Sequence, residues 1–143
     1  MKFFLIVFLF LGTYAFCQSE AGNDIIIACI KEKVINEEKN GNEKKEFNVF
    51  LEQNGFLKIN DTIINGKNIH FLSNDEIRKK SKKGFVVFNI SPFIIYNNDI
   101  RIIIMKEFYK KKRISFLNKS IYVFNYDCKQ EQFVLKDVNN QLW

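Results

Sequence analysis

The sequence predicts an α+β domain in which N-terminal helices pack on a curved antiparallel sheet of about four strands. Apolar residues in the first half recur at helical spacing. The second half, from Phe85 onward, consists of runs rich in Val, Ile, Phe and Tyr that turn-forming residues separate. Helices that precede the strands, rather than alternate with them, are typical of the α+β class.

The chain begins with a lysine and about ten apolar residues, a pattern typical of a secretory signal peptide and too short to span a membrane. Ala15 and Cys17 are the small residues that cleavage requires. The sequence therefore predicts a signal peptide over residues 1–17 and a single α+β domain over residues 18–143, exported to the periplasm or secreted. Two alternatives stay open: an uncleaved membrane anchor, and lipid anchoring at Cys17, which the bulky Phe16 before it disfavours.

Two cysteines, Cys29 and Cys128, remain near the two ends of the exported domain. In an oxidising compartment they permit one disulfide. The alternative is two unpaired thiols that pack as small apolar side chains.

The first predicted helix covers residues 23–41. Ile26, Ile30 and Val34 form an apolar stripe at helical spacing, and Gly41 is a suitable helix end.

The next segment, residues 42–55, is ambiguous. Phe47 and Phe50 fit helical spacing and follow a charged first turn, so a helix is favoured. The alternative is a hairpin that turns at Asn54-Gly55. A clearer hairpin follows over residues 61–73, where short apolar runs flank Asn65-Gly66.

A short basic helix is predicted over residues 74–82. Ser73 and Glu76 have the spacing of a capping box, and Gly84 is a plausible stop.

The predicted strands cover residues 85–96, 99–109, 120–127 and 132–138. Pro92 interrupts the first strand and predicts a bulge or an edge position there, because proline cannot donate to the ladder. Ile102 and Ile104 share one face of the second strand while Ile103 and Met105 make the other face apolar, so the sheet should be covered on both sides or curl around a core. In the order of its predicted elements, the chain resembles cystatin-like and nuclear-transport-factor-2-like rolls. This resemblance implies a helix that lies in the concavity of the sheet.

Groups suited to catalysis are few. His70 is the single histidine, which excludes mechanisms with two histidines and multi-histidine zinc sites; we expect no metal and no cofactor. A roll-type enzyme would use His70, Glu107 or a tyrosine, Tyr122 or Tyr126, and would require these side chains to converge around one pocket. The alternative is a hydrogen-bonded hairpin histidine and a glutamate that faces water.

Two basic clusters are the strongest local feature. They consist of Arg78, Lys79, Lys80, Lys82 and Lys83, and of Lys110, Lys111, Lys112 and Arg113. Basic residues beside aromatic ones can bind nucleic acid, but an exported chain meets little of it. An anionic polysaccharide, an anionic membrane surface or an acidic protein fits better. The alternative is a solvated basic face that keeps sheet edges from pairing.

Three functions remain open. The leading one is a small exported non-catalytic binding domain that uses either the concave mouth of the sheet or the basic clusters. The second is an inhibitor or immunity-type protein that blocks a partner enzyme. The third is a small roll-type enzyme.

Overall fold

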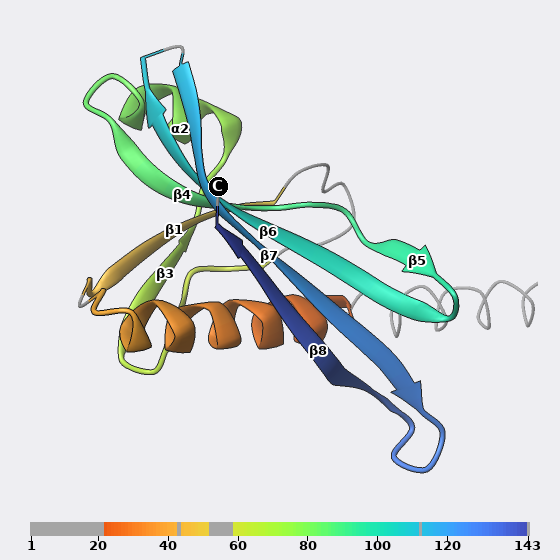
Figure 1. Cartoon of the computed structure of the whole chain (residues 1–143). Helices are drawn as coiled ribbons and strands as arrows, with labels where there is room; N and C mark the ends of the chain where they lie inside the picture. The colour runs from red at the N-terminus through yellow and green to blue at the C-terminus, as the bar shows by residue number, and fades with distance from the viewer. Residues whose placement is uncertain (1–21, 43, 52–58, 112, 143) are drawn as a thin grey trace, which may run out of the picture.

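A computed structural model describes residues 22–42, 44–51, 59–111 and 113–142. The predicted leader, Cys17 and the Asn54-Gly55 pair lie outside these residues. The described residues form two helices and one strongly curled mixed sheet, a half-barrel (Figure 1). The long helix covers residues 22–39. The other elements are β1 (Glu46–Leu51), β2 (Thr62–Ile64), β3 (Lys67–Phe71), α2 (Asn74–Lys80), β4 (Phe85–Ile90), β5 (Ile94–Tyr96), β6 (Asp99–Lys110), β7 (Arg113–Asp127) and β8 (Gln132–Leu142).

The strand order is β2-β3-β1-β4-β6-β7-β8, with β5 also pairing with β6. β1 runs parallel to both β3 and β4, and the other pairs are antiparallel. The α+β class is confirmed, but the expectation of a purely antiparallel sheet of about four strands is wrong. Three strands from the first half join the sheet, and the first predicted strand ends before Pro92 and resumes as β5.

The helix predicted over residues 42–55 is wrong, because its central part is strand β1. Phe47 and Val49 are buried at 4% and 0% exposure, while Asn48 between them is less buried, which is the two-residue period of a strand. β1 lies between two parallel neighbours, and this tertiary pairing overrides the local helical signal of its charged start. The turn of the alternative hairpin, Asn54-Gly55, lies outside the described residues; within them, the two partners of β1 are both parallel strands.

The predicted end of the long helix is confirmed. Gly41 has φ +80°. Its amide donates to the Glu38 carbonyl at 2.9 Å, and the Asn42 amide donates to the Glu37 carbonyl at 2.9 Å. These two bonds are the Schellman motif, which satisfies carbonyls that a helix end leaves open.

Two other local predictions are also confirmed. Asn65 and Gly66 adopt φ 50° and 72° between β2 and β3, as a type I′ hairpin turn requires. Ser73 caps α2 with the reciprocal bonds of a capping box to Glu76.

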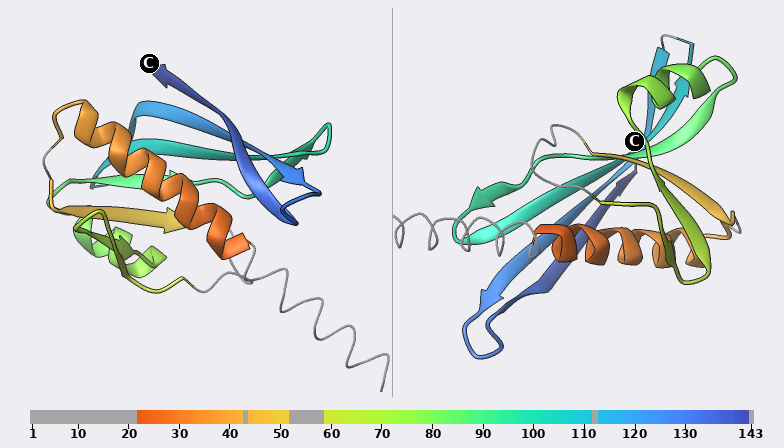
Figure 2. Two further views of the ribbon diagram at one scale, coloured as in Figure 1. Left: turned by 90° about the horizontal axis from the view of Figure 1, so that it is seen from below. Right: turned by 180° about the vertical axis from the view of Figure 1, so that it is seen from behind.

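The main core lies between the long helix and the concave face of the sheet, as the view from below shows (Figure 2). Ile26, Ile30 and Val34 of the helix are at most 2% exposed. They pack in one cluster with buried side chains from the sheet, among them Val49, Phe88, Ile90, Ile102, Ile104, Tyr122 and Phe124.

The outer face of the sheet has a smaller cover of its own. Val87 alternates with Phe88 and therefore faces outward, yet it is fully buried, and Leu72 and Ile77 in and beside α2 are buried as well. Lys80 of α2 donates to the Asn48 side chain of β1 at 2.7 Å. α2 thus covers part of the outer face, on the side away from the long helix (Figure 1). Cover on both faces was expected from the apolar residues on both sides of the strands.

Candidate functional site

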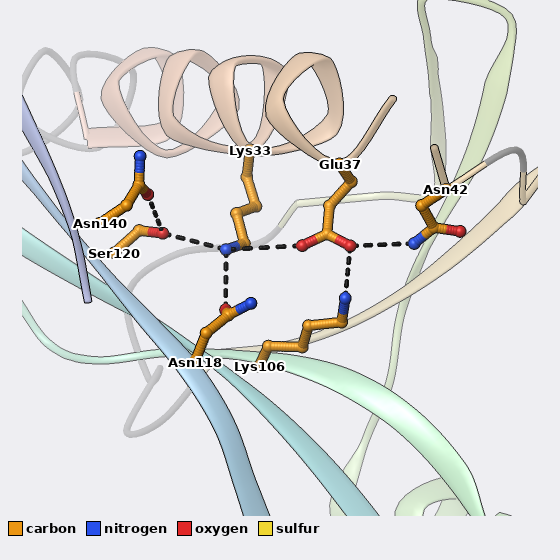
Figure 3. A network of polar contacts seen from close by, with 7 residues as sticks. All are labelled: Lys33, Glu37, Asn42, Lys106, Asn118, Ser120 and Asn140. Carbon is orange, nitrogen blue, oxygen red and sulfur yellow. Dashed lines mark hydrogen bonds and ion pairs between the residues drawn. The ribbon is translucent and has the colours of Figure 1, made fainter. Parts of the chain in front are cut away.

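A buried polar network joins the long helix to the concave face of the sheet (Figure 3). Lys33 and Glu37 lie one turn apart on the helix, are only 3% and 5% exposed, and form an ion pair at 3.6 Å. The Lys33 ammonium also donates to Asn118 Oδ1 at 3.0 Å and to Ser120 Oγ at 2.9 Å, both on β7. Burial lowers the pKa of Lys33. The nearby Glu37 carboxylate raises it, but offsets only part of the effect of burial.

Glu37 lies at the centre of this network. Its other oxygen accepts hydrogen bonds from the Lys106 ammonium of β6 at 2.5 Å and from Asn42 Nδ2 at 2.9 Å. Burial opposes ionisation of Glu37, but these two bonds outweigh it and hold its pKa below the usual value. Ser120 in turn donates to Asn140 of β8 at 2.6 Å, so the network reaches three strands. Its charged groups are engaged with one another, so its role is to fix the helix on the sheet.

Glu37 is not among the candidate site residues that the sequence predicts. The signal that could have revealed its burial is its position. Residues 33 and 37 fall three residues after Ile30 and Val34, on the flank of the apolar stripe.

A groove of about 430 Å³ opens beside this network. Phe47 and Phe88, whose rings stack at 5.5 Å, belong to its lining. The complete lining is Asn42, Lys44, Lys45, Glu46, Phe47, Asn48, Phe85, Val86, Phe88 and Lys106. We compare this groove with the concave mouth of the sheet that the sequence predicts as a binding site. One of its lysines, Lys106, pairs with the Glu37 carboxylate, which offsets the charge of that lysine.

The two predicted basic clusters lie on the surface. Arg78, Lys79 and Lys80 form the last turn of α2, Lys82 and Lys83 follow it, and all five are exposed. Lys110, Lys111 and Arg113 are exposed at the turn between β6 and β7, whereas Lys112 lies outside the described residues.

The fold brings these two clusters together. The Lys111 amide donates to the Ser81 carbonyl, just after α2, at 2.6 Å. Gly84 approaches the same hairpin so closely that a Cβ atom there would lie 3.0 Å from the Phe108 ring. Figure 1 shows α2 and the β6–β7 turn side by side at one end of the molecule. We call their joint surface the composite basic surface; it consists of Arg78, Lys79, Lys80, Lys82, Lys83, Lys110, Lys111 and Arg113.

Little negative charge balances the composite basic surface. Arg78 pairs with Asp75 at 3.8 Å, but both side chains are more than 80% exposed, so water screens the pair. Within the part of the chain that the structure describes, no ion pair with a carboxylate engages Lys79, Lys82, Lys83, Lys110, Lys111 or Arg113. Uncompensated charge concentrated in this way attracts anions.

The residues considered for catalysis are not brought together. His70 lies on β3, where its Nδ1 is 2.8 Å from Asp61 Oδ2, in agreement with the hydrogen-bonded hairpin histidine. This hydrogen bond, with one from the Phe71 amide, holds the pKa of Asp61 below its usual value. Two strands, β1 and β4, separate His70 from Glu107 on β6, which amounts to about 14 Å at normal strand spacing.

Glu107 and the two tyrosines occupy three different environments. Glu107 does not face water; it is 2% exposed and lies near Asn89, whose amide donates to it at 3.4 Å. Tyr122 is buried in the main core, and burial raises the pKa of its hydroxyl. Tyr126 is 45% exposed on the same strand.

Both cysteines are free in this structure. Cys29 is fully buried in the main core, where burial raises the pKa of its thiol, and Cys128 is exposed in the turn between β7 and β8. The Cys29–Cys128 bridge, one of the two alternatives from the sequence, is not formed here.

Among the described residues, no cluster of three or more His, Cys, Asp or Glu side chains is arranged to hold a metal ion. The same residues include no helix long and apolar enough to cross a membrane. Comparisons with known proteins found no matching family model, no matching curated protein and no matching solved structure.

Proposed function

We propose that this protein is a small exported binding domain without a catalytic role, and that it binds a polyanion through the composite basic surface. The observation that carries the proposal is the hydrogen bond from the Lys111 amide to the Ser81 carbonyl. It unites clusters that lie about thirty residues apart in the sequence into one surface.

The way the charges are held supports a binding role. α2 is fixed by its capping box and by the contact of Lys80 with Asn48, and the hairpin is fixed by its pairing with β4. A polyanion would therefore meet charges on a preorganised backbone, and only the long side chains would lose freedom on binding. The concave mouth, where a roll would place a ligand, is occupied largely by the long helix and the polar network, which favours the outer surface.

Heparin, a soluble polyanion, provides the test. We compare the chain in the form that cells produce with two charge-reversed pairs, Lys82→Glu with Lys83→Glu and Lys110→Glu with Arg113→Glu. Each pair should weaken binding at least about tenfold, because several basic contacts are replaced by repulsion. The matched control is Lys31→Glu with Lys129→Glu, which makes the same charge change at exposed positions on the long helix and in the β7–β8 turn.

The control should bind heparin nearly as tightly as the unchanged protein. Equal weakening by the control would mean that heparin responds only to net charge, and the proposal would be wrong. Export is tested separately by mass spectrometry of the N-terminus in the extracytoplasmic fraction, where we expect the chain to begin at Gln18. A chain found only in the cytosol would contradict export.

A further inference from the structure

Exposed apolar side chains directly adjoin the composite basic surface. Ile114, Phe116 and Leu117 follow Arg113 on β7 and are 50%, 59% and 40% exposed. We call these three residues the apolar strip. Side chains of this size are costly to leave in water, and here they lie within four residues of a basic turn.

The strand register shows how two of these side chains point. Ile114 is opposite Tyr109, and Phe116 is opposite Glu107, which is itself opposite Val87. Residues paired in this way share a face, so Ile114 and Phe116 lie on the outer face of the sheet, the face that α2 covers farther along. Leu117 lies at the irregularity that shifts the register between Lys106 and Glu107. The basic groups of α2 and the apolar side chains of β7 therefore border the same face.

We propose that the partner of the composite basic surface is an anionic lipid bilayer, and that the apolar strip enters its interfacial region. This inference rests on the proposed function and specifies its ligand. Lipid phosphates would pair with the lysines and arginines, while the hydrocarbon beneath them would take up Ile114 and Phe116. Stable attachment of a peripheral protein requires two such signals, and this end of the molecule carries both.

The chemistry of the strip favours a bilayer over a polysaccharide. A sulfated or carboxylated polysaccharide satisfies the basic groups but has no apolar interior for Ile114 and Phe116. The shape also fits, because the hairpin and α2 project together at one end of the molecule and can approach an extended surface (Figure 1).

The test is co-sedimentation with vesicles of phosphatidylcholine, with and without phosphatidylglycerol, at physiological salt. The variant is Ile114→Thr with Phe116→Thr, which keeps strand propensity and all charges. The control is Ile94→Thr with Ile95→Thr, which changes two side chains of 45% and 78% exposure on β5, at the other end of the sheet. All proteins are compared in the form that cells produce, so any contribution from the N-terminal residues is common to them.

We expect the unchanged protein and the β5 control to bind phosphatidylglycerol vesicles and to ignore pure phosphatidylcholine. The apolar-strip variant should lose at least about tenfold in vesicle affinity while keeping its heparin affinity. Circular dichroism verifies that the variant folds. If the variant does not fold, Leu117→Thr alone provides the same comparison, with a smaller expected loss of vesicle affinity.

The outcomes separate the two proposals. Vesicle binding that the strip variant retains in full would overturn the bilayer inference. Heparin binding without vesicle binding would do the same and would point to a polysaccharide partner, with the proposed function intact. If the protein binds neither heparin nor vesicles at physiological salt, both the proposed function and the bilayer inference are wrong.

Discussion

The concave face and the outer end of this molecule use lysine in opposite ways. On the concave face, Lys33 has a carboxylate and two neutral oxygen acceptors, and Lys106 shares the same carboxylate, Glu37. At the outer end, the lysines of the composite basic surface are exposed, and seven of its eight members have no carboxylate partner at ion-pair distance among the described residues; the exception is Arg78.

Desolvation explains the difference. A buried charge must be paired and hydrogen-bonded, because its loss of hydration costs several kcal/mol. An exposed charge keeps its hydration and needs no partner to be tolerated. Substitutions on the concave face should therefore cost stability, whereas substitutions at the outer end should cost binding and leave stability almost unchanged.

The largest effect is expected from Glu37→Ala. It removes the carboxylate that Lys33 and Lys106 share and leaves a buried cation uncompensated, which should lower the free energy of unfolding by about 3–5 kcal/mol. Urea denaturation measures it. Glu38→Ala is the matched control on the same helix; its carboxylate pairs with Lys67 at the surface at 3.3 Å, so the cost should stay below about 1 kcal/mol. Equal losses of stability in the two variants would show that the buried network contributes no more than a surface ion pair.

Gly84→Ala should have the next largest effect on stability, and it should also weaken binding at the composite basic surface. At φ +85° an alanine is strained, and its Cβ would lie 3.0 Å from the Phe108 ring, so we expect a loss of about 2–4 kcal/mol. Gly66→Ala has a similar strain at φ +72° with nothing within 4 Å, and should cost only about 1–2 kcal/mol. Only the first variant should also weaken heparin binding, because its Cβ presses on the Phe108 ring of the hairpin that carries Lys110 and Lys111. Identical behaviour of the two variants would count against the close contact.

Ser73→Ala should have a smaller effect. It removes the side-chain oxygen that caps α2, at a cost of about 1 kcal/mol. Thermal unfolding checks this against Ser115→Ala, an exposed strand serine whose loss should change stability by less than about 0.5 kcal/mol. A Ser73→Ala protein as stable as the control would mean that the cap does not hold α2.

The smallest expected effect is the change in stability that Glu37 causes as the pH falls. The pKa of Glu37 lies below its usual value of 4.5 in the folded state, so between these two pKa values the unfolded chain binds more protons. The contribution of Glu37 to the free energy of unfolding is therefore complete above about pH 4.5 and is lost as the pH falls through the folded pKa. Glu37→Gln should flatten this part of the curve of stability against pH. A curve parallel to that of the unchanged protein would contradict the pKa shift.

Local signals were sufficient for much of the fold. Gly41, the Asn65-Gly66 pair and the Ser73 capping box each act within a few residues, and each appears where the sequence predicted it. β1 could not be recognised because its burial comes from β3 and β4, which are distant in the sequence. The same limit applies to the candidate site: both basic clusters are visible in the sequence, but the Lys111–Ser81 contact that joins them depends on how α2 packs.

A titration of the ¹⁵N-labelled protein with a short heparin oligosaccharide, followed by amide chemical shifts, tests most directly whether the two clusters act as one binding surface. We expect the amides of residues 78–83, 110, 111, 113 and 114 to shift together along one binding curve, while those around Phe47 and Lys106 in the groove stay in place. Shifts confined to one cluster, or centred on the groove, would contradict it.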